Sequence, residues 1–261
     1  MSESYLSSLF GLSGQVAVVI GGTGVLGGAI TNALARAGAF VFISGRGPER
    51  GEELAAEIRA WGGKAAFAAL EATLRASNEA LLATVLAQAG RVDMLVNCAG
   101  TNSAAPYFET KDEDWSRVLE TNLTSTHLAC QIFGAHMAGS GEGGAILNIG
   151  SVTAHTPLSR VFAYSASKAA VINLTQNVAR ELAPYKVRVN AICPGFFPAE
   201  QNRSILDAER VANIMAQTPM ARYGEPDELA GAALLLLSRT AGSYITGAIY
   251  YVDGGFTAMR F

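Results

Sequence analysis

The chain has 261 residues and a formal net charge of −3, with 50% hydrophobic and 16% charged residues. This charge gives no basic field for nucleic acid or an anionic membrane, and no apolar run approaches the ~20 residues that span a bilayer. The length fits one large core, and no linker rich in Pro, Gly or Ser divides it. We therefore expect a single domain over residues 1–261 that binds neither nucleic acid nor membrane.

The cysteines and the N-terminus favour a cytoplasmic protein. Cys98, Cys130 and Cys193 are odd in number and widely spaced, without a C-x-x-C pair or a histidine cluster that would complete a metal site. Residues 1–14 show no basic segment followed by an apolar core. We expect reduced thiols, no bound metal and a soluble protein.

The first predicted unit is a strand, a glycine-rich turn and a helix. Residues 16–20 form a short apolar run rich in β-branched residues, which predicts a strand covered on both faces. Glycines occupy much of the next eight positions, and a helix is predicted over 29–37. Backbone N–H groups at a helix start attract a pyrophosphate, although such a turn can also serve packing alone. The predicted cofactor contacts here are Gly21, Gly22, Thr23, Gly24, Val25 and Leu26.

The alternation of strand and helix then repeats to the end of the chain. Further strands are predicted over 40–43, 65–70, 94–97, 145–149, 187–192 and 248–252, and further helices over 48–61, 77–89, 112–137, from about 164, and over 226–237. Such alternation predicts right-handed crossovers and a parallel sheet between helices. The fold class is thus α/β, a doubly wound Rossmann-type domain with a seven-stranded parallel sheet and helices on both faces.

In such a sheet, ligands bind beyond the carboxyl ends of the strands. The second strand is followed by Arg46, about 25 residues after the glycine turn begins, where an acidic residue would bind the ribose of NAD. An arginine there favours NADP, with NAD possible. Other strand ends supply further candidate cofactor contacts, which are Glu71, Asn97, Ala99, Gly100, Pro194 and Gly195.

Tyr164 and Lys168 are the candidate proton-transfer pair. Residues four apart lie on one face of a helix, so the phenol and the ammonium can enter the same cleft. A nearby cation favours phenolate, which would lower the pKa of Tyr164 and allow proton exchange with an alcohol or ketone. Ser151 ends the fifth strand and faces the same crevice.

Taken in order, the glycine turn, Asn97–Gly100, Asn122, Ser151, Tyr164, Lys168 and Pro194-Gly195 resemble the short-chain dehydrogenase/reductase family. The resemblance covers residues 14–255. It implies that Ser151 polarises the substrate oxygen and that Tyr164 gives or takes the proton. Lys168 would hold the nicotinamide ribose and lower the Tyr164 pKa, and Asn122 would support a water in the proton path.

The family pattern also implies a homo-oligomer, a tetramer or a dimer, and the apolar run 230–237 would be buried in a subunit contact as well as in the core. Three positions depart from the pattern. Ile20 and Ala199 each stand where a threonine is common, and Glu71 stands where an aspartate is common. These departures bear on cofactor affinity and not on the fold.

Substrate specificity is expected from a lid over about 196–224. Its sequence resembles the mannonate oxidoreductase (fructuronate reductase-like) branch of the family, which acts on sugar acids. An anionic polyol would be bound by the polar and charged candidates His155, Arg160, Gln201, Asn202 and Arg203.

Two alternatives to a sugar acid or polyol substrate stay open. An apolar ketone would be better suited by the aromatic residues Phe108, Phe162, Phe196 and Phe197, so a 3-oxoacyl thioester (acyl carrier protein) reductase is one alternative. A nucleotide-binding sensor or scaffold without turnover is the other. The complete set of Asn122, Ser151, Tyr164 and Lys168 favours an enzyme acting on CH–OH groups.

Overall fold

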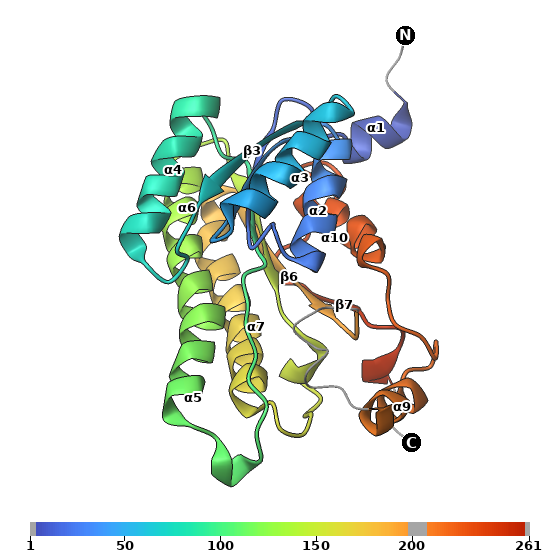
Figure 1. Ribbon diagram of the computed structural model, residues 1–261. Coiled ribbons are helices and arrows are strands. Elements are labelled where there is room, and N and C mark those ends of the chain that lie inside the picture. The colour runs from blue at the N-terminus through green and yellow to red at the C-terminus, as the bar shows by residue number, and fades with distance from the viewer. Residues whose placement is uncertain (1–3, 198–207, 259–261) are drawn as a thin grey trace.

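A computed structural model describes residues 4–197 and 208–258, and its centre is a sheet of seven parallel strands (Figure 1). The strand order is β3-β2-β1-β4-β5-β6-β7. The strands are β1 (Val16–Ile20), β2 (Phe40–Gly45), β3 (Lys64–Ala69), β4 (Met94–Asn97), β5 (Gly144–Ile149), β6 (Val187–Pro194) and β7 (Ile249–Val252). The predicted fold class is confirmed.

Helices cover both faces of the sheet, which explains why the central strands are apolar throughout. One core lies between the sheet and α2 (Val25–Arg36), α3 (Pro48–Ala60) and α10 (Ala230–Leu237). The other lies between the sheet and α4 (Arg75–Ala89), α6 (Ser125–Ser140) and α7 (Phe162–Leu182). All five residues of β1 are buried, because alternate side chains enter the two cores.

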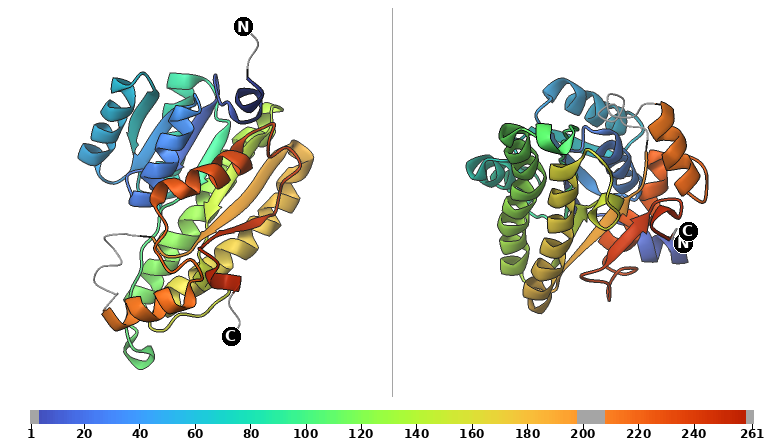
Figure 2. Two further views of the ribbon diagram at one scale, coloured as in Figure 1. Left: turned by 90° about the vertical axis from the view of Figure 1, so that its right-hand side faces the viewer. Right: turned by 90° about the horizontal axis from the view of Figure 1, so that it is seen from below.

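The remaining helices lie toward the ends of the molecule. Helix α1 (Tyr5–Phe10) and helix α9 (Ala208–Gln217) lie at opposite ends in Figure 2, and α5 (Asp112–Leu119) leads into α6. Within the described residues, no helix is both long and apolar enough to cross a membrane.

The site is positioned by the reversal of strand order at β1. This strand pairs with β2 on one side and with β4 on the other, so that Ile20 lies beside both Ser44 and Asn97. The connections leave in opposite directions on either side of β1, which opens a crevice beyond its carboxyl end.

Several element boundaries differ from those predicted. Helix α2 begins at Val25 and not at residue 29, because the later glycines of the turn lie in its first turn. The helix predicted over 112–137 is interrupted by a π-helical turn, η2 (Glu120–Thr124). Residues 196–224, expected to be irregular, contain the ten-residue helix α9. The short N-terminal helix α1 has no counterpart in the predicted elements.

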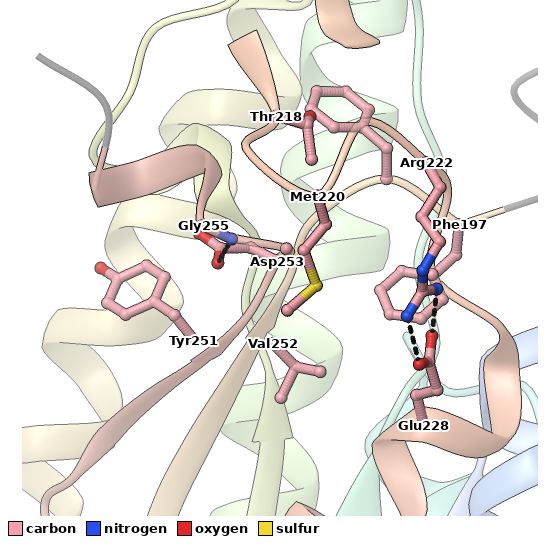
Figure 3. A pocket seen from close by; sticks show the side chains of 12 residues that line it. Phe197, Thr218, Met220, Arg222, Glu228, Tyr251, Val252, Asp253 and Gly255 are labelled. Carbon is pink, nitrogen blue, oxygen red and sulfur yellow. Dashed lines mark hydrogen bonds and ion pairs between the residues drawn. The ribbon is translucent and has the colours of Figure 1, made fainter.

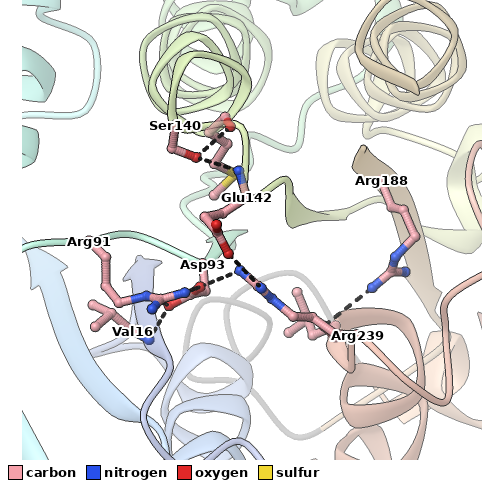
Figure 4. A network of polar contacts seen from close by, with 9 residues as sticks. Val16, Arg91, Asp93, Ser140, Glu142, Arg188 and Arg239 are labelled. Carbon is pink, nitrogen blue, oxygen red and sulfur yellow. Dashed lines mark hydrogen bonds and ion pairs between the residues drawn. The ribbon is translucent and has the colours of Figure 1, made fainter. Parts of the chain in front are cut away.

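A buried carboxylate ties the amino ends of the strands together (Figure 4). Asp93 accepts the backbone N–H of Val16 at 2.8 Å and forms ion pairs with Arg91 and Arg239. Arg239 also lies 3.9 Å from Glu142, which precedes β5. The network therefore joins β1, β4, the α6–β5 turn and the segment after α10.

Candidate active site

A cleft of about 380 Å³ lies at the carboxyl ends of β1, β2, β4 and β5. Eleven of the predicted site residues line it, namely Gly21, Thr23, Gly24, Val25, Leu26, Arg46, Glu71, Ala99, Gly100, Tyr164 and Lys168. Further lining residues, which were not among the predicted site residues, are Ile20, Gly27, Gly45, Arg50, Leu70, Ala72, Thr73, Cys98, Thr121 and Ile149. Most of these are chain neighbours of predicted residues in the same turns.

The glycine turn forms a cradle that suits a pyrophosphate. Gly21 has a φ of +79°, and a methyl group added there would lie 2.6 Å from the backbone nitrogen of Ala99. The first turn of α2 contains no acidic residue, and its N-cap, Gly24, makes no side-chain capping bond. N–H groups at this helix start are therefore available to an anion. Gly22 does not line the cleft and instead packs beneath the turn, against Ile43 and Thr31.

Two arginines line the cleft where β2 ends and α3 begins. Arg46 directly follows β2, and Arg50 lies in the first turn of α3. The sequence did not single out Arg50, although its position four residues after Arg46 was a usable signal. Glu71 lines the same cleft and accepts a hydrogen bond from Thr73 Oγ1 at 3.0 Å. Guanidinium groups at this place suit a phosphate.

Ser151, Tyr164 and Lys168 converge from the end of β5 and the first two turns of α7. The Ser151 side chain forms a hydrogen bond with the Tyr164 hydroxyl. Lys168 Nζ lies 5.6 Å from the centroid of the Tyr164 ring and donates a 2.7 Å hydrogen bond to Ile149 O. Ser151 and Lys168 are buried, whereas Tyr164 is half-buried.

Burial decides the protonation of these groups. It raises the pKa of Tyr164, although the hydrogen bond from Ser151 acts in the opposite direction. Burial also lowers the pKa of Lys168 to about 8 and raises that of Cys98 to about 11. The expectation that Lys168 would bring the Tyr164 pKa below its ordinary value is wrong in this structure, because removal of the phenolate from water outweighs any nearby cation.

Asn122 lies in the π-helical turn η2 and links three segments. Thr101 N–H donates to Asn122 Oδ1 at 2.8 Å, and Asn122 Nδ2 donates to Thr101 O and to Ser167 Oγ, each at 3.0 Å. Ser167 Oγ in turn donates to Tyr164 O at 2.7 Å. All donors and the acceptor of the Asn122 amide are thus used to position the loop after β4 against α7.

Some predicted cofactor residues lie outside the lining of the cleft. The Asn97 side chain is buried and donates to Asn148 Oδ1 at 2.8 Å, so it braces β4 against β5. Pro194 ends β6 beside Val252, and Gly195 packs so closely on Asp253 that an added methyl would lie 2.7 Å from its Cα.

The described substrate candidates do not share one cavity: Arg160 lines one, whereas Phe196 and the ring neighbour of His155, Tyr251, line another. Arg160 has a φ of +69° and lines a separate cavity of about 260 Å³ that Lys111 also lines. The His155 ring lies 5.9 Å from that of Tyr251. Phe196 lines another cavity, of about 410 Å³, beside β7. Figure 3 shows this cavity, with Arg222 paired to Glu228 on one side. Gln201, Asn202 and Arg203 lie outside the described residues, as does Ala199.

Comparison with known proteins identifies the family. A family model described as "Enoyl-(Acyl carrier protein) reductase" matches residues 23–257. The uncharacterized oxidoreductase UxuB of Bacillus subtilis (strain 168) is 37% identical, over 95% of this chain and 96% of its own length. A gluconate 5-dehydrogenase of Gluconobacter oxydans (strain 621H) is 34% identical, over 95% and 97%.

The solved structures show the same likeness in three dimensions. The crystal structure of a gluconate 5-dehydrogenase from Burkholderia cenocepacia J2315 in complex with NADP and tartrate has a TM-score of 0.93. It is 32% identical, and the match covers 98% of this chain and 100% of that one. Together with the cleft geometry, these matches show that the chain belongs to the short-chain dehydrogenase/reductase family, whose members are NAD(P)-dependent oxidoreductases that act on CH–OH groups.

Proposed function

We propose that the protein interconverts a secondary alcohol and a ketone of a sugar acid or related polyol, with Tyr164 as the acid/base. The observation that carries this proposal is that Tyr164, bonded to Ser151 and one helical turn before Lys168, lines the same cleft as the glycine turn. A nicotinamide cofactor would be held by the glycine turn and Lys168, and it supplies or accepts the hydride when bound.

The residues of the chain would handle the proton and the charge. Negative charge develops on the substrate oxygen as the carbonyl is reduced, and the hydroxyl groups of Ser151 and Tyr164 can donate to that oxygen. The raised pKa keeps Tyr164 protonated at neutral pH, so that it can act as the acid. Asn122 would support the proton path by positioning, because its amide holds the loop after β4 against α7.

The substrate class rests on the relatives and on the charges near the site. Gluconate 5-dehydrogenases are sugar acid enzymes by name, and the cations Arg160, before α7, and Lys111, before α5, line one cavity together with Asp114. As the finer part of this proposal, we place the protein in the mannonate oxidoreductase branch of the family. A 3-oxoacyl thioester reductase is the second candidate; the matching family model is described as a reductase of another acyl carrier protein thioester, the enoyl one, whose reducible bond is C=C and not C=O.

A substrate screen tests the proposal. Initial rates with gluconate, other sugar acids, polyols and 3-oxoacyl thioesters are measured in both directions with both cofactors. We expect turnover of a sugar acid or polyol, and we expect Tyr164→Phe to lose at least about 1,000-fold in kcat while NADPH still binds. Tyr185→Phe, at an exposed tyrosine after α7, is the matched control. Wild-type rates in Tyr164→Phe would reject the acid/base assignment, and binding of nucleotide without any turnover would favour a sensor.

We also propose a preference for NADP over NAD, supported by Arg46 and Arg50 on the wall of the cleft. The substitution Arg46→Ala with Arg50→Ala should raise KM for NADPH by about 10-fold or more and leave KM for NADH almost unchanged. Arg180→Ala, at an exposed position near the end of α7, is the control. A preference for NADH that survives in the double variant would contradict the assignment.

Three further properties belong to the same proposal. Residues 196–224 follow β6 and would bound the substrate side of the site as a lid, with α9 as its regular part. The free Cys98, Cys130 and Cys193 support a reducing, cytoplasmic location.

A homo-oligomer is proposed from the family pattern, and its subunit number is measured by light scattering. In helix α10, Ala233, Leu236 and Leu237 are buried against α2 and the sheet, and the other five residues are partly or fully exposed.

A further inference from the structure

Thr153 donates twice to the hydroxyl oxygen of Ser151. Ser151 is the N-cap of a single 3₁₀ turn, Val152–Ala154, which follows β5. The backbone N–H of Thr153 donates to Ser151 Oγ at 3.2 Å, and Thr153 Oγ1 donates to the same oxygen at 3.1 Å. Both side chains are buried, at 6% and 7% exposure, so water has little access to compete for these bonds.

A serine hydroxyl has two lone pairs and one proton. When Thr153 occupies both lone pairs, only the proton of Ser151 is left to interact with another group. We propose that Thr153 is a positioning residue that holds Ser151 as a hydrogen-bond donor toward Tyr164 and the substrate oxygen. This inference rests on the proposed function, in which Ser151 touches that oxygen.

The backbone around Ser151 is held in place, so the main motion that Thr153 can restrict is the rotation of the Ser151 hydroxyl group. The N–H of Ser151 is hydrogen-bonded to Cys193 in the neighbouring strand β6. The preceding residue, Gly150, also packs closely on β6, because a methyl group added there would lie 2.6 Å from Cys193 Sγ. With the main chain held in this way, the direction of the Ser151 proton depends on what bonds its oxygen.

The direction of that proton matters for the charge that forms during reduction. A Ser151 proton aimed at the developing oxyanion stabilises it, whereas a lone pair aimed at it would repel it. When Thr153 fixes this direction, the Ser151 hydroxyl does not need to rotate before the oxyanion forms. The effect of Thr153 on the rate must therefore disappear when the Ser151 hydroxyl is removed.

The kinetic test is a double-mutant cycle. Thr153→Val removes the hydroxyl while keeping the shape and the backbone N–H, and it should lower kcat about 10-fold with cofactor affinity unchanged. Thr153→Ser should restore the rate. In a Ser151→Ala background, itself reduced about 100-fold, Thr153→Val should cause no further loss. Thr156→Val, three residues later in the same loop, is the control.

A second readout needs neither substrate nor cofactor. The hydrogen bond from Ser151 acts to lower the pKa of Tyr164, so loosening Ser151 should raise it. The tyrosinate absorbance of each protein minus that of its Tyr164→Phe counterpart gives the titration of Tyr164. It should shift upward in Thr153→Val and should not shift further when Ser151→Ala is already present.

The outcomes separate this inference from the proposed function. Wild-type kcat and an unchanged Tyr164 titration in Thr153→Val, or an equal loss in the Ser151→Ala background, would overturn the role of Thr153 alone. Full activity of Ser151→Ala would instead overturn the role of Ser151 in the proposed function. If the valine variant does not fold, Thr153→Ala removes the same hydroxyl without adding bulk at Cγ and is held to the same criteria.

Discussion

Lys168 carries an ammonium group that burial makes costly. Only 5% of the residue is exposed, and the bond to Ile149 O is its one hydrogen bond among the described residues. Burial lowers its pKa from 10.5 to about 8. Below pH 8 the lysine is charged in the folded and the unfolded states, and the folded state bears a cost of about 3 kcal/mol. Between pH 8 and 10.5 the unfolded state binds more protons, so this cost falls as the pH rises.

Lys168→Met should therefore change the pH dependence of stability. We expect the free energy of unfolding of the wild type to rise relative to that of the variant by about 3 kcal/mol from pH 8 to 10.5. Urea unfolding at pH 7, 8, 9 and 10 measures the difference. Lys64→Met, at an exposed position in β3, should run parallel to the wild type. A constant gap between Lys168→Met and the wild type would show that the ammonium is not destabilised by burial.

The same residue shows what a sequence can and cannot predict at this scale. The spacing of Tyr164 and Lys168 correctly predicted that both would line one cleft, because helical periodicity is a local property. It predicted the wrong direction for the Tyr164 pKa, because that direction depends on burial among residues from β4, β5 and β6. Cys98 and Cys193, whose pKa burial raises to about 11, flank this site and provide Lys168 with no anionic partner at neutral pH.

Among the elements, the turn between β1 and α2 has strict steric requirements at Gly21. Gly21 and Gly14 both have a positive φ, at +79° and +76°, so alanine is strained at either position. They differ in their surroundings. A methyl at Gly21 would lie 2.6 Å from Ala99 N, whereas nothing lies within 4 Å of one at Gly14.

The two glycines therefore form a matched pair for substitution. Gly14→Ala should cost about 1 kcal/mol of unfolding free energy and leave NADPH binding unchanged. Gly21→Ala should cost about 3 kcal/mol or more and weaken NADPH binding at least 10-fold, because the turn must move away from β4. Thermal unfolding and a fluorescence titration with NADPH measure both effects. Equal losses in the two variants would mean that backbone strain, and not the close approach to Ala99, governs the turn.

Element boundaries were harder to predict than element types. Helix α2 starts four residues earlier than predicted, since Gly27 and Gly28 are poor helix formers, and Gly27 is used here for close packing under the turn. The π-helical turn around Asn122 leaves no periodic trace in the sequence, because one extra residue in a helix shifts the pattern only slightly. Helix α9 was missed because the polar composition of its segment resembled a loop.

At the scale of the whole molecule, the strand and helix alternation was sufficient to predict the sheet. A parallel sheet between two helical layers follows from buried β-branched strands that need crossovers, and the predicted seven strands are all present. The sequence could not predict which side chains beyond the ends of β5 and β6 share a cavity. Arg160 and His155 both follow β5, whereas Phe196 follows β6. Arg160 lines one cavity, but Phe196 lines another together with Tyr251, the ring neighbour of His155.

The sheet is used differently at its two ends. The carboxyl ends hold the cleft, where glycines and a buried lysine cost stability. At the amino ends, the Asp93 carboxylate, with 1% of its side chain exposed, joins β1 to Arg91 and Arg239. Because these partners come from segments far apart in the sequence, the contact stabilises only the complete fold and not any local element.

Asp93→Asn should lower the unfolding free energy by about 3 kcal/mol, because it leaves an amide N–H facing donors and removes the charge shared by two arginines. Asp114→Asn, which breaks the exposed pair with Arg117, should cost less than about 1 kcal/mol. Urea unfolding at pH 7 compares the two variants. Because Asp93 lies at the opposite end of the sheet from the cleft, kcat per folded molecule should stay at the wild-type value in Asp93→Asn. A small stability loss in Asp93→Asn, or a loss of kcat without unfolding, would contradict this separation of the stabilising end from the catalytic end.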